Sequence, residues 1–246
     1  MEILRAGYDD ASGTGPAVGL IVLESDEVLE RELAAWLPPA FRRFHARIAN
    51  ATDVTADTLR AMERELPAAA ALLPASVAFD VVAYGCTSAS AVIGEARVAE
   101  LVGSVVPNAA VTNPLSAAKA RLADLGASRV ALLTPYSRAV SRAVLEHLES
   151  AGLEVVRAAT FDERDDSRVA RIAERSTLEA MVRLAAGGGV DAVFGSCTNL
   201  RALNVLDEAA RRAGVPALTS NSALAWHIER LAASRAVAAG AGAPAA

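Results

Sequence analysis

Two cysteines, Cys86 and Cys197, stand where the pattern of this 246-residue chain indicates chemistry. Each follows a short apolar run typical of a β-strand and precedes a segment with helical spacing. Ligands of parallel α/β sheets bind at the carboxyl ends of the strands, and the free N–H groups of a helix start lower the pKa of a thiol. The hydroxyl and amide residues beside the thiols can hydrogen-bond a bound carboxylate: Thr87, Ser88, Thr198 and Asn199.

Each cysteine taken singly has a simpler interpretation, because free cysteine is usually a small buried hydrophobe. A redox pair is a further alternative. We favour a catalytic pair, since two thiols on opposite faces of one carbon atom supply one base and one acid. Under cytosolic redox conditions both thiols stay reduced.

Few other reactive groups accompany the cysteines. Lys119 is the only lysine, and the three histidines (His45, His147 and His227) are separated from one another and from both cysteines. The sequence has no HExxH or CxxC motif and no phosphate-binding glycine loop after a strand. It therefore predicts chemistry with no metal and no cofactor.

Composition excludes several classes of protein. Hydrophobic residues make up 53% and the net charge is −5, which is incompatible with a disordered chain. Nucleic-acid binding needs a basic face, and none is present. The most apolar segment, 66–79, is broken by Pro67 and Pro74, so no membrane span is expected. The first residues lack a signal-peptide pattern, and we expect a cytoplasmic protein.

Short apolar runs alternate with longer amphipathic ones, as in βαβ units with parallel sheets. The predicted strands are 18–23, 42–48, 81–84, 109–112, 130–134, 155–159, 190–194 and 217–219. Helical spacing covers 28–36, 58–66, a segment after 87, 115–125, 140–148, 169–185, 200–212 and 223–236.

The two halves of the chain resemble each other. The pattern D-x-V-x-x-x-C-T occurs at 80–87 and again at 191–198. Strand 20–23 similarly matches 130–133, and 112–113 matches 220–221. We interpret these ordered matches as an internal duplication rather than chance similarity of two α/β halves. Two pseudo-symmetric lobes would let the Cys-Thr turns face each other across a cleft.

Together, these motifs resemble the aspartate/glutamate racemase superfamily, in particular its maleate isomerase and arylmalonate decarboxylase branch. The resemblance covers most of the chain, from about residue 18 to 230, and 22–30 and 196–201 look most like members found with ectoine-utilisation genes. The segments that carry it are GLIVLESD (19–26), YGCTS (84–88), NPLSAA (113–118), LTPY (133–136), SCTNLR (196–201) and SNSALAWH (220–227).

The resemblance implies two Rossmann-like α/β lobes with parallel sheets, related by pseudo-twofold symmetry, with the active site in the cleft between them. We assign residues 1–113 and 222–246 to the first lobe, with Cys86, and 114–221 to the second, with Cys197. It also implies that no cofactor is used and that the protein is a homodimer. The cysteines would be the acid/base or nucleophilic pair, and the residues expected to bind substrate are Asp26, Thr87, Ser88, Tyr136, Thr198, Asn199 and Asn221.

Two features discriminate within the branch. The decarboxylases have glycine in place of the first cysteine, so both cysteines favour an isomerase or racemase. The maleate isomerases usually carry asparagine where this chain has Asp26, which puts maleate in doubt and suggests an ammonium or N–H near the substrate carboxylate, or a protonated Asp26. Alternatively, Asp26 caps the helix near 28. Of the acids Asp162, Asp165 and Asp166, we expect most to lie in a solvated loop.

The expected function is that of a cofactor-independent isomerase, either a racemase or a cis–trans isomerase, acting on a small carboxylic or amino acid. The alternatives are an arylmalonate-type decarboxylase and a non-catalytic small-molecule-binding protein linked to ectoine degradation.

Overall fold

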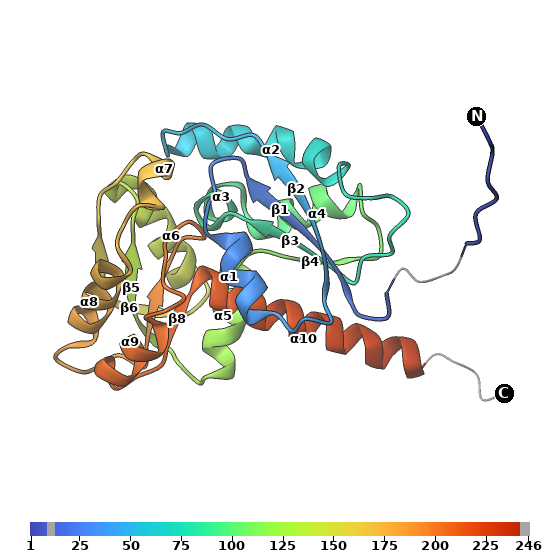
Figure 1. Cartoon of the computed structure of the whole chain (residues 1–246). Helices are drawn as coiled ribbons and strands as arrows, with labels where there is room; N and C mark the ends of the chain where they lie inside the picture. Colours follow the sequence, from blue (N-terminus) through green and yellow to red (C-terminus); the bar gives the residue numbers. More distant parts are fainter. Residues whose placement is uncertain (9–12, 242–246) are drawn as a thin grey trace.

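Strands and helices alternate along the computed structural model, which describes residues 1–8 and 13–241 (Figure 1). The strands form two four-stranded sheets in which every pairing is parallel. The first, ordered β2-β1-β3-β4, contains β1 (Ala17–Leu23), β2 (Arg42–Ile48), β3 (Val81–Gly85) and β4 (Ala110–Thr112). The second, ordered β6-β5-β7-β8, contains β5 (Arg129–Thr134), β6 (Glu154–Thr160), β7 (Ala192–Gly195) and β8 (Ala217–Thr219).

The two sheets have the same topology. In each, the first strand in chain order pairs with the second and the third, and the fourth lies outside the third. Cys86 follows the third strand of the first sheet and Cys197 the third strand of the second. The predicted fold of two parallel α/β lobes is therefore confirmed, and this matching order is what an internal duplication produces.

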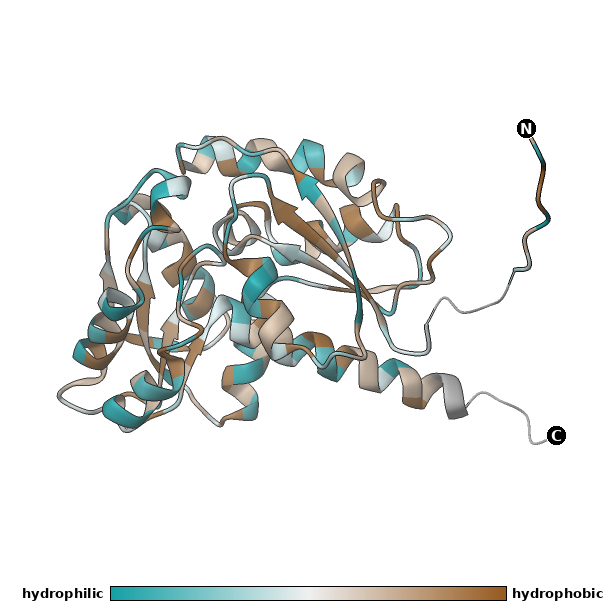
Figure 2. Ribbon diagram, in the orientation of Figure 1, coloured by the Kyte–Doolittle hydropathy of each residue, from teal (hydrophilic) through white to brown (hydrophobic). Residues whose placement is uncertain are grey.

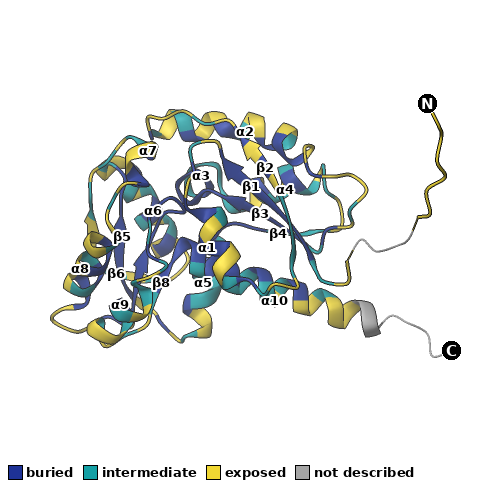
Figure 3. Cartoon of the chain, viewed as in Figure 1, coloured by how far each residue is buried: buried dark blue, intermediate teal, exposed yellow. Residues whose placement is uncertain are grey.

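The central strands are buried on both faces. Every residue of β1 and of β3 is buried, as expected for parallel strands covered by helices on both sides (Figure 3). In Figure 2 the central strand β1 is coloured as hydrophobic, whereas the surrounding helices carry hydrophilic residues on their outer sides. The uninterrupted apolar runs of the sequence thus become the core of each lobe.

The helices connect the strands as the spacing predicts, but several of them begin or end at other residues than predicted. They are α1 (Leu29–Trp36), α2 (Ala56–Ala70), α3 (Thr87–Ile93), α4 (Glu95–Gly103), α5 (Pro114–Asp124), α6 (Arg138–Ser150), α7 (Asp166–Val169), α8 (Glu174–Ala185), α9 (Leu206–Ala213) and α10 (Ser220–Ala241). Among the described residues, no helix is both long and apolar enough to cross a bilayer.

Two predicted helices were wrong at their first turns. Of the predicted helix 169–185, only Val169 lies in α7, residues 170–173 are not helical, and α8 begins at Glu174. In this break the Ile172 carbonyl accepts hydrogen bonds from the Arg201 guanidinium (2.9 and 3.1 Å) instead of a helical N–H. The predicted helix 200–212 begins only at Leu206, and a turn precedes it. Both changes lie beside the turn that carries Cys197.

The last helix links the lobes. After β8 the chain enters α10, which packs against β3 and β4 of the first sheet and against α1 and α5. Figure 1 shows α10 (red) running beneath the first sheet, away from the second. At the start of α5, Asn113 accepts hydrogen bonds from Leu115 and Ser116 N–H (3.0 and 3.1 Å), and Pro114 occupies the first helical position that favours proline.

Candidate active site

Cys86 lies in the turn between β3 and α3. Its Sγ accepts a hydrogen bond from Ala89 N–H (3.4 Å), so the cysteine itself caps α3. The preceding residue is Gly85, and a Cβ there would lie 2.3 Å from Leu29 Cδ2 of α1. Glycine therefore permits the close approach of α1 to the end of β3, which holds Cys86 at the carboxyl edge of the first sheet.

Cys197 occupies the matching place in the second sheet, just beyond β7. Its Sγ accepts a hydrogen bond from Asn199 N–H (3.3 Å). The sequence predicts that a helix starts here, but α9 begins only at Leu206. The thiol is consequently held by a turn and its backbone amide.

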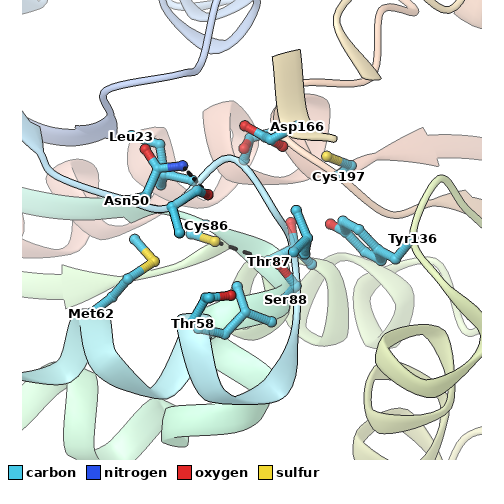
Figure 4. A pocket seen from close by; sticks show the side chains of 14 residues that line it. Leu23, Asn50, Thr58, Met62, Cys86, Thr87, Ser88, Tyr136, Asp166 and Cys197 are labelled. Atoms are coloured by element: carbon cyan, nitrogen blue, oxygen red, sulfur yellow. Dashed lines mark hydrogen bonds between the residues drawn. The ribbon is translucent and has the colours of Figure 1, made fainter. Parts of the chain in front are cut away.

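Both thiols line one small pocket between the sheets. Cys86 is 3% exposed and Cys197 4%. In Figure 4 the two sulfur atoms point into the same space from different elements. The other lining residues are Leu23, Asn50, Ala51, Val54, Thr58, Leu59, Met62, Thr87, Ser88, Tyr136, Asp166 and Thr198.

The structure brings most of the predicted site residues to this cavity. Thr87 lies at the start of α3, where its hydroxyl shares a hydrogen bond with the Ser220 hydroxyl (2.8 Å). The next residue, Ser88, places its Oγ 3.7 Å from Cys86 Sγ. The predicted residues that line the cavity are Cys86, Thr87, Ser88, Tyr136, Cys197 and Thr198, whereas Asp26, Asn199 and Asn221 do not line it.

Tyr136 follows β5 and is buried. Its hydroxyl lies near the Cys197 sulfur, and its donor character lowers the pKa of the thiol. Burial, and next the nearby thiols of Cys197 and Cys86, raise the pKa of Tyr136 well above its usual value. Tyr136 is therefore a permanent donor that faces both sulfur atoms.

Tyr136→Phe should impair activation of Cys197, because the thiolate loses a hydrogen-bond donor. We expect turnover to fall about 10²-fold, as for removal of one preorganised donor, and the pH profile of Cys197 alkylation to move to higher pH. The measurement is alkylation rate against pH, read at each cysteine by mass spectrometry. Tyr8→Phe at an exposed tyrosine is the control. An unchanged profile would contradict this role.

The electrostatic setting disfavours a thiolate in the free protein. Burial raises the pKa of Cys86 to about 11, an effect opposed by the Ala89 N–H and the Ser88 hydroxyl. Burial raises the pKa of Cys197 well above its usual value, and the nearby Asp166 carboxylate raises it further. The expectation that helix N–H groups lower these pKa values toward neutrality is thus wrong here, because desolvation outweighs the donors.

Asp166 is a cavity residue that the sequence did not single out from its acidic loop. It lies in α7, 5% exposed, and both donors to its carboxylate bond Oδ2: Ser25 through its hydroxyl, and Asn199 through Nδ2 (3.2 Å). Burial raises its pKa. The only signal in the sequence was its place among the acids Asp162, Asp165 and Asp166, and the donors to its carboxylate are far away in sequence.

Asp26 lies behind the cavity. Its Oδ1 accepts hydrogen bonds from Val28 and Leu29 N–H (2.8 Å each), which is the capping arrangement considered from the sequence. The Oδ2 atom is buried and has no hydrogen-bond partner among the described residues. The Thr198 hydroxyl lies close to this carboxyl but donates to the Gly85 carbonyl (3.2 Å). Burial is the main reason that the pKa of Asp26 rises from 3.8 to about 6.

Asp26→Asn should stabilise the fold at neutral pH. Since the folded state binds this proton more tightly, the contribution of Asp26 to wild-type stability is greatest below the unfolded pKa of 3.8 and is lost as pH rises through about 6. Asparagine retains the acceptor for Val28 and Leu29 and removes the buried charge. We expect a gain on the order of 2–3 kcal/mol near neutral pH that shrinks in acid.

Urea unfolding of the two proteins at about pH 5 and about pH 8 measures this difference. Asp162→Asn makes the same chemical change at an exposed residue and should alter stability little at either pH. A gain that is equal at both pH values, or a loss at the higher one, would contradict a buried charge at Asp26.

The two asparagines hold the second cysteine turn from behind. Asn199 Nδ2 donates to the Asp166 carbonyl (2.9 Å), and its Oδ1 accepts from Glu27 N–H (2.9 Å). Asn221 Nδ2 donates to the Thr198 carbonyl (2.8 Å) and to Glu32 (2.8 Å). Their side-chain contacts are therefore with the protein, and these contacts fix the residues that follow Cys197.

Glu32 is a second residue that the sequence gave no reason to select. It is fully buried on α1, and its carboxylate accepts hydrogen bonds from Ala202 and Leu203 N–H (2.9 and 3.0 Å) as well as from Asn221. Burial raises its pKa. A glutamate of the first lobe thus anchors the turn that carries Cys197 in the second.

Loops from the two lobes also meet beside the cavity. Val54 N–H donates to the Arg164 carbonyl (2.9 Å), and Asp166 N–H donates to the Thr52 carbonyl (3.1 Å). Arg164 forms an ion pair with Asp53 (2.7 Å). In Figure 1 this contact lies where α7 approaches the start of α2. The backbone of Asp166 is thereby tied to the first lobe.

The fold and the site thus define a protein with two parallel α/β sheets and a pocket between them that both cysteines line. Among the described residues, no group of three or more metal-ligating side chains could hold a metal ion. The chain belongs to the arylmalonate decarboxylase family, whose model matches residues 18–244.

The proteins to which the chain is similar include maleate isomerases. The chain is 29% identical to the maleate isomerase of Nocardia farcinica, over 87% of this chain and 88% of the relative. It is 25% identical to that of Geobacillus stearothermophilus, over 86% and 89%. Among solved structures, a cysteine-to-serine mutant of the N. farcinica maleate cis–trans isomerase, with a covalently bound succinylcysteine intermediate, is 27% identical, with a TM-score of 0.80 over 89% of this chain and 93% of that one. These findings confirm the family resemblance and identify the chain as an isomerase.

Proposed function

We propose that this protein isomerises a small carboxylic or amino acid, with Cys86 and Cys197 as its thiol and thiolate pair. The observation that carries the proposal is the meeting of both sulfur atoms in one buried cavity. Tyr136 and Ser88 add hydroxyl donors to the same space. Such an arrangement provides a base or nucleophile on one side of a substrate and an acid on the other.

Substrate binding begins with its carboxylate. The first N–H groups of a helix have no partner within the helix, so the amides of Thr87 and Ser88 are free to donate. The hydroxyls of Ser88 and Tyr136 complete a set of donors that stabilise the negative charge which builds on the carboxylate during reaction. One thiol must lose its proton before reaction, since burial keeps both protonated in the free protein.

Two routes use these groups. In a racemisation, one thiolate removes the α-proton and the opposite thiol delivers its own proton to the other face. In a cis–trans isomerisation, the thiolate forms a C–S bond to one carbon of an activated double bond, and the electron pair moves onto the carboxylate. Rotation about the new single bond follows, and elimination expels the thiolate and restores the double bond. The succinylcysteine intermediate of the N. farcinica relative supports the second route.

The test is incubation in deuterium oxide with small α-amino acids, N-acyl diamino acids and maleate. We expect deuterium at the α-carbon of an amino acid or cis–trans conversion of an unsaturated acid, without loss of carbon dioxide. Release of carbon dioxide from a malonate-type acid would instead favour the decarboxylase. Tight binding with neither exchange nor conversion would favour a binding protein.

Further predictions belong to this proposal. We propose the lobe division 1–113 with 222–246, and 114–221, which is supported by the packing of α10 on β3 and β4. Asp26, Asn199 and Asn221 would act on substrate through the residues they hold rather than by contact. A homodimer, a cytoplasmic location and a role in ectoine degradation stay predictions from the sequence.

A further inference from the structure

The charges of the cavity restrict what it can bind. Among its lining residues there is one carboxyl, Asp166, and no lysine, arginine or histidine. The arginines on the neighbouring segments are exposed and paired with other acids: Arg164 with Asp53, Arg168 with Glu163 and Arg171 with Glu27. In the part of the chain that the structure describes, no positive side chain therefore compensates Asp166.

The Asp166 carboxylate has an unused side. The hydroxyl of Ser25 and the amide of Asn199 both donate to Oδ2, whereas Oδ1 has no hydrogen-bond partner among the described residues. Burial raises the pKa of Asp166, and the two donors on Oδ2 oppose this rise. A buried carboxylate is normally paired with a positive group, which would favour its ionised form. In Figure 4 the Asp166 carboxyl and Ser88 lie on opposite sides of the line between the two sulfur atoms.

We propose, on the basis of the function proposed above, that the substrate is a small acid carrying a positively charged amino group, and that Asp166 Oδ1 binds this ammonium. The carboxylate of the same molecule lies at Thr87 and Ser88, so its two charged groups bind the second and first lobes respectively. A dicarboxylate would instead bring a second negative charge against Asp166. Asp166 is thus a residue that determines specificity.

The ammonium also has a consequence for the thiols. Asp166 and Asp26 both raise the pKa of Cys86 and of Cys197, because each carboxylate lies near both sulfur atoms. A bound ammonium offsets the negative charge of Asp166, and the pKa values of both thiols then fall. The correct substrate thereby favours formation of the thiolate that attacks it, whereas an anionic ligand without the amino group does not.

The test uses Asp166→Asn, with Asp162→Asn as the control at an exposed residue of the same loop. Calorimetry compares pairs of acids that differ only by an α-ammonium: aspartate with succinate, 2-aminobutyrate with butyrate, and 2,4-diaminobutyrate with 4-aminobutyrate. In wild-type protein, we expect the α-ammonium member of at least one pair to bind about tenfold or more tightly. Asp166→Asn should abolish that preference and improve maleate binding. In the same variant without ligand, the alkylation profile of Cys197 should move to lower pH.

Several results would overturn the inference. These are equal or tighter binding of the α-deaminated member in every pair, absence of binding by every ammonium-bearing acid, or an unchanged preference in Asp166→Asn. Repeating the binding series in Cys197→Ser separates this inference from the proposed function. If the ammonium preference persists there while wild-type protein isomerises nothing, the proposed function fails and the inference stands. If wild-type protein isomerises maleate but disfavours ammonium-bearing acids, the reverse holds.

Discussion

Cys86→Ser and Cys197→Ser are each expected to lower turnover by about 10²–10⁴-fold while the fold is retained. An alcohol is a far weaker acid than a thiol, so serine supplies neither the thiolate nor a readily transferred proton. The burial that raises the pKa of each thiol would equally disfavour ionisation of a serine hydroxyl at the same position. The measurement is the initial rate of deuterium exchange or cis–trans conversion in each purified variant.

Circular dichroism and urea unfolding serve as controls, since serine nearly matches cysteine in volume and should change stability little. If proton transfer operates, each single variant should still exchange the α-proton from the one face that retains a thiol, without inverting the carbon. If thiol addition operates, the variant lacking the nucleophile should form no covalent adduct. Full turnover by either variant would contradict the two-thiol site.

Glu32→Ala is expected to destabilise the protein by about 3–5 kcal/mol and to reduce turnover together with stability. The substitution leaves buried donors without an acceptor: the N–H groups of Ala202 and Leu203 and the Asn221 amide. The turn after Cys197 then loses its anchor on α1. Urea unfolding gives the stability change, and turnover is measured where the variant is still folded.

Glu32→Gln refines this test. Glutamine keeps an acceptor for the two backbone N–H groups but turns an NH₂ toward Asn221 Nδ2. Among the residues that the structure describes, Asn221 Oδ1 has no hydrogen-bond partner. If the Asn221 amide turned to offer this oxygen to the glutamine NH₂, the oxygen would also face the Thr198 carbonyl oxygen. We therefore expect a smaller loss than for alanine. Glu65→Ala, at an exposed glutamate of α2, should change stability by less than about 0.5 kcal/mol, and a comparable loss there would contradict the anchoring role.

The fold and the position of both thiols could be predicted from the chain because their causes are local. Apolar runs such as 81–84 and 190–194 form strands wherever helices cover them, and the residue that follows a strand lies at the edge of the sheet. Repetition of the Cys-Thr turn then indicated two equivalent lobes. Each of these inferences needs only residues that are near one another in sequence.

Helix ends beside the site were less predictable. Helical spacing continues through Ile172, yet its carbonyl bonds to Arg201, 29 positions away, and the helix is interrupted. The turn after Cys197 similarly stays non-helical while Glu32, 170 positions from Ala202, accepts its N–H groups. A distant polar partner can replace a helical hydrogen bond at little cost, and no local pattern records that partner.

What the residues alone decide is the pair of parallel sheets with a cysteine at the edge of each, since short-range periodicity and burial suffice to build them. The protonation of those cysteines and the charge of the space between them arise only on folding. Asp166 meets Ser25 across 141 positions, and it is burial in the assembled cavity that sets the thiol pKa values. Desolvation and Coulomb interactions depend on distance in space, and the chain order does not contain that distance.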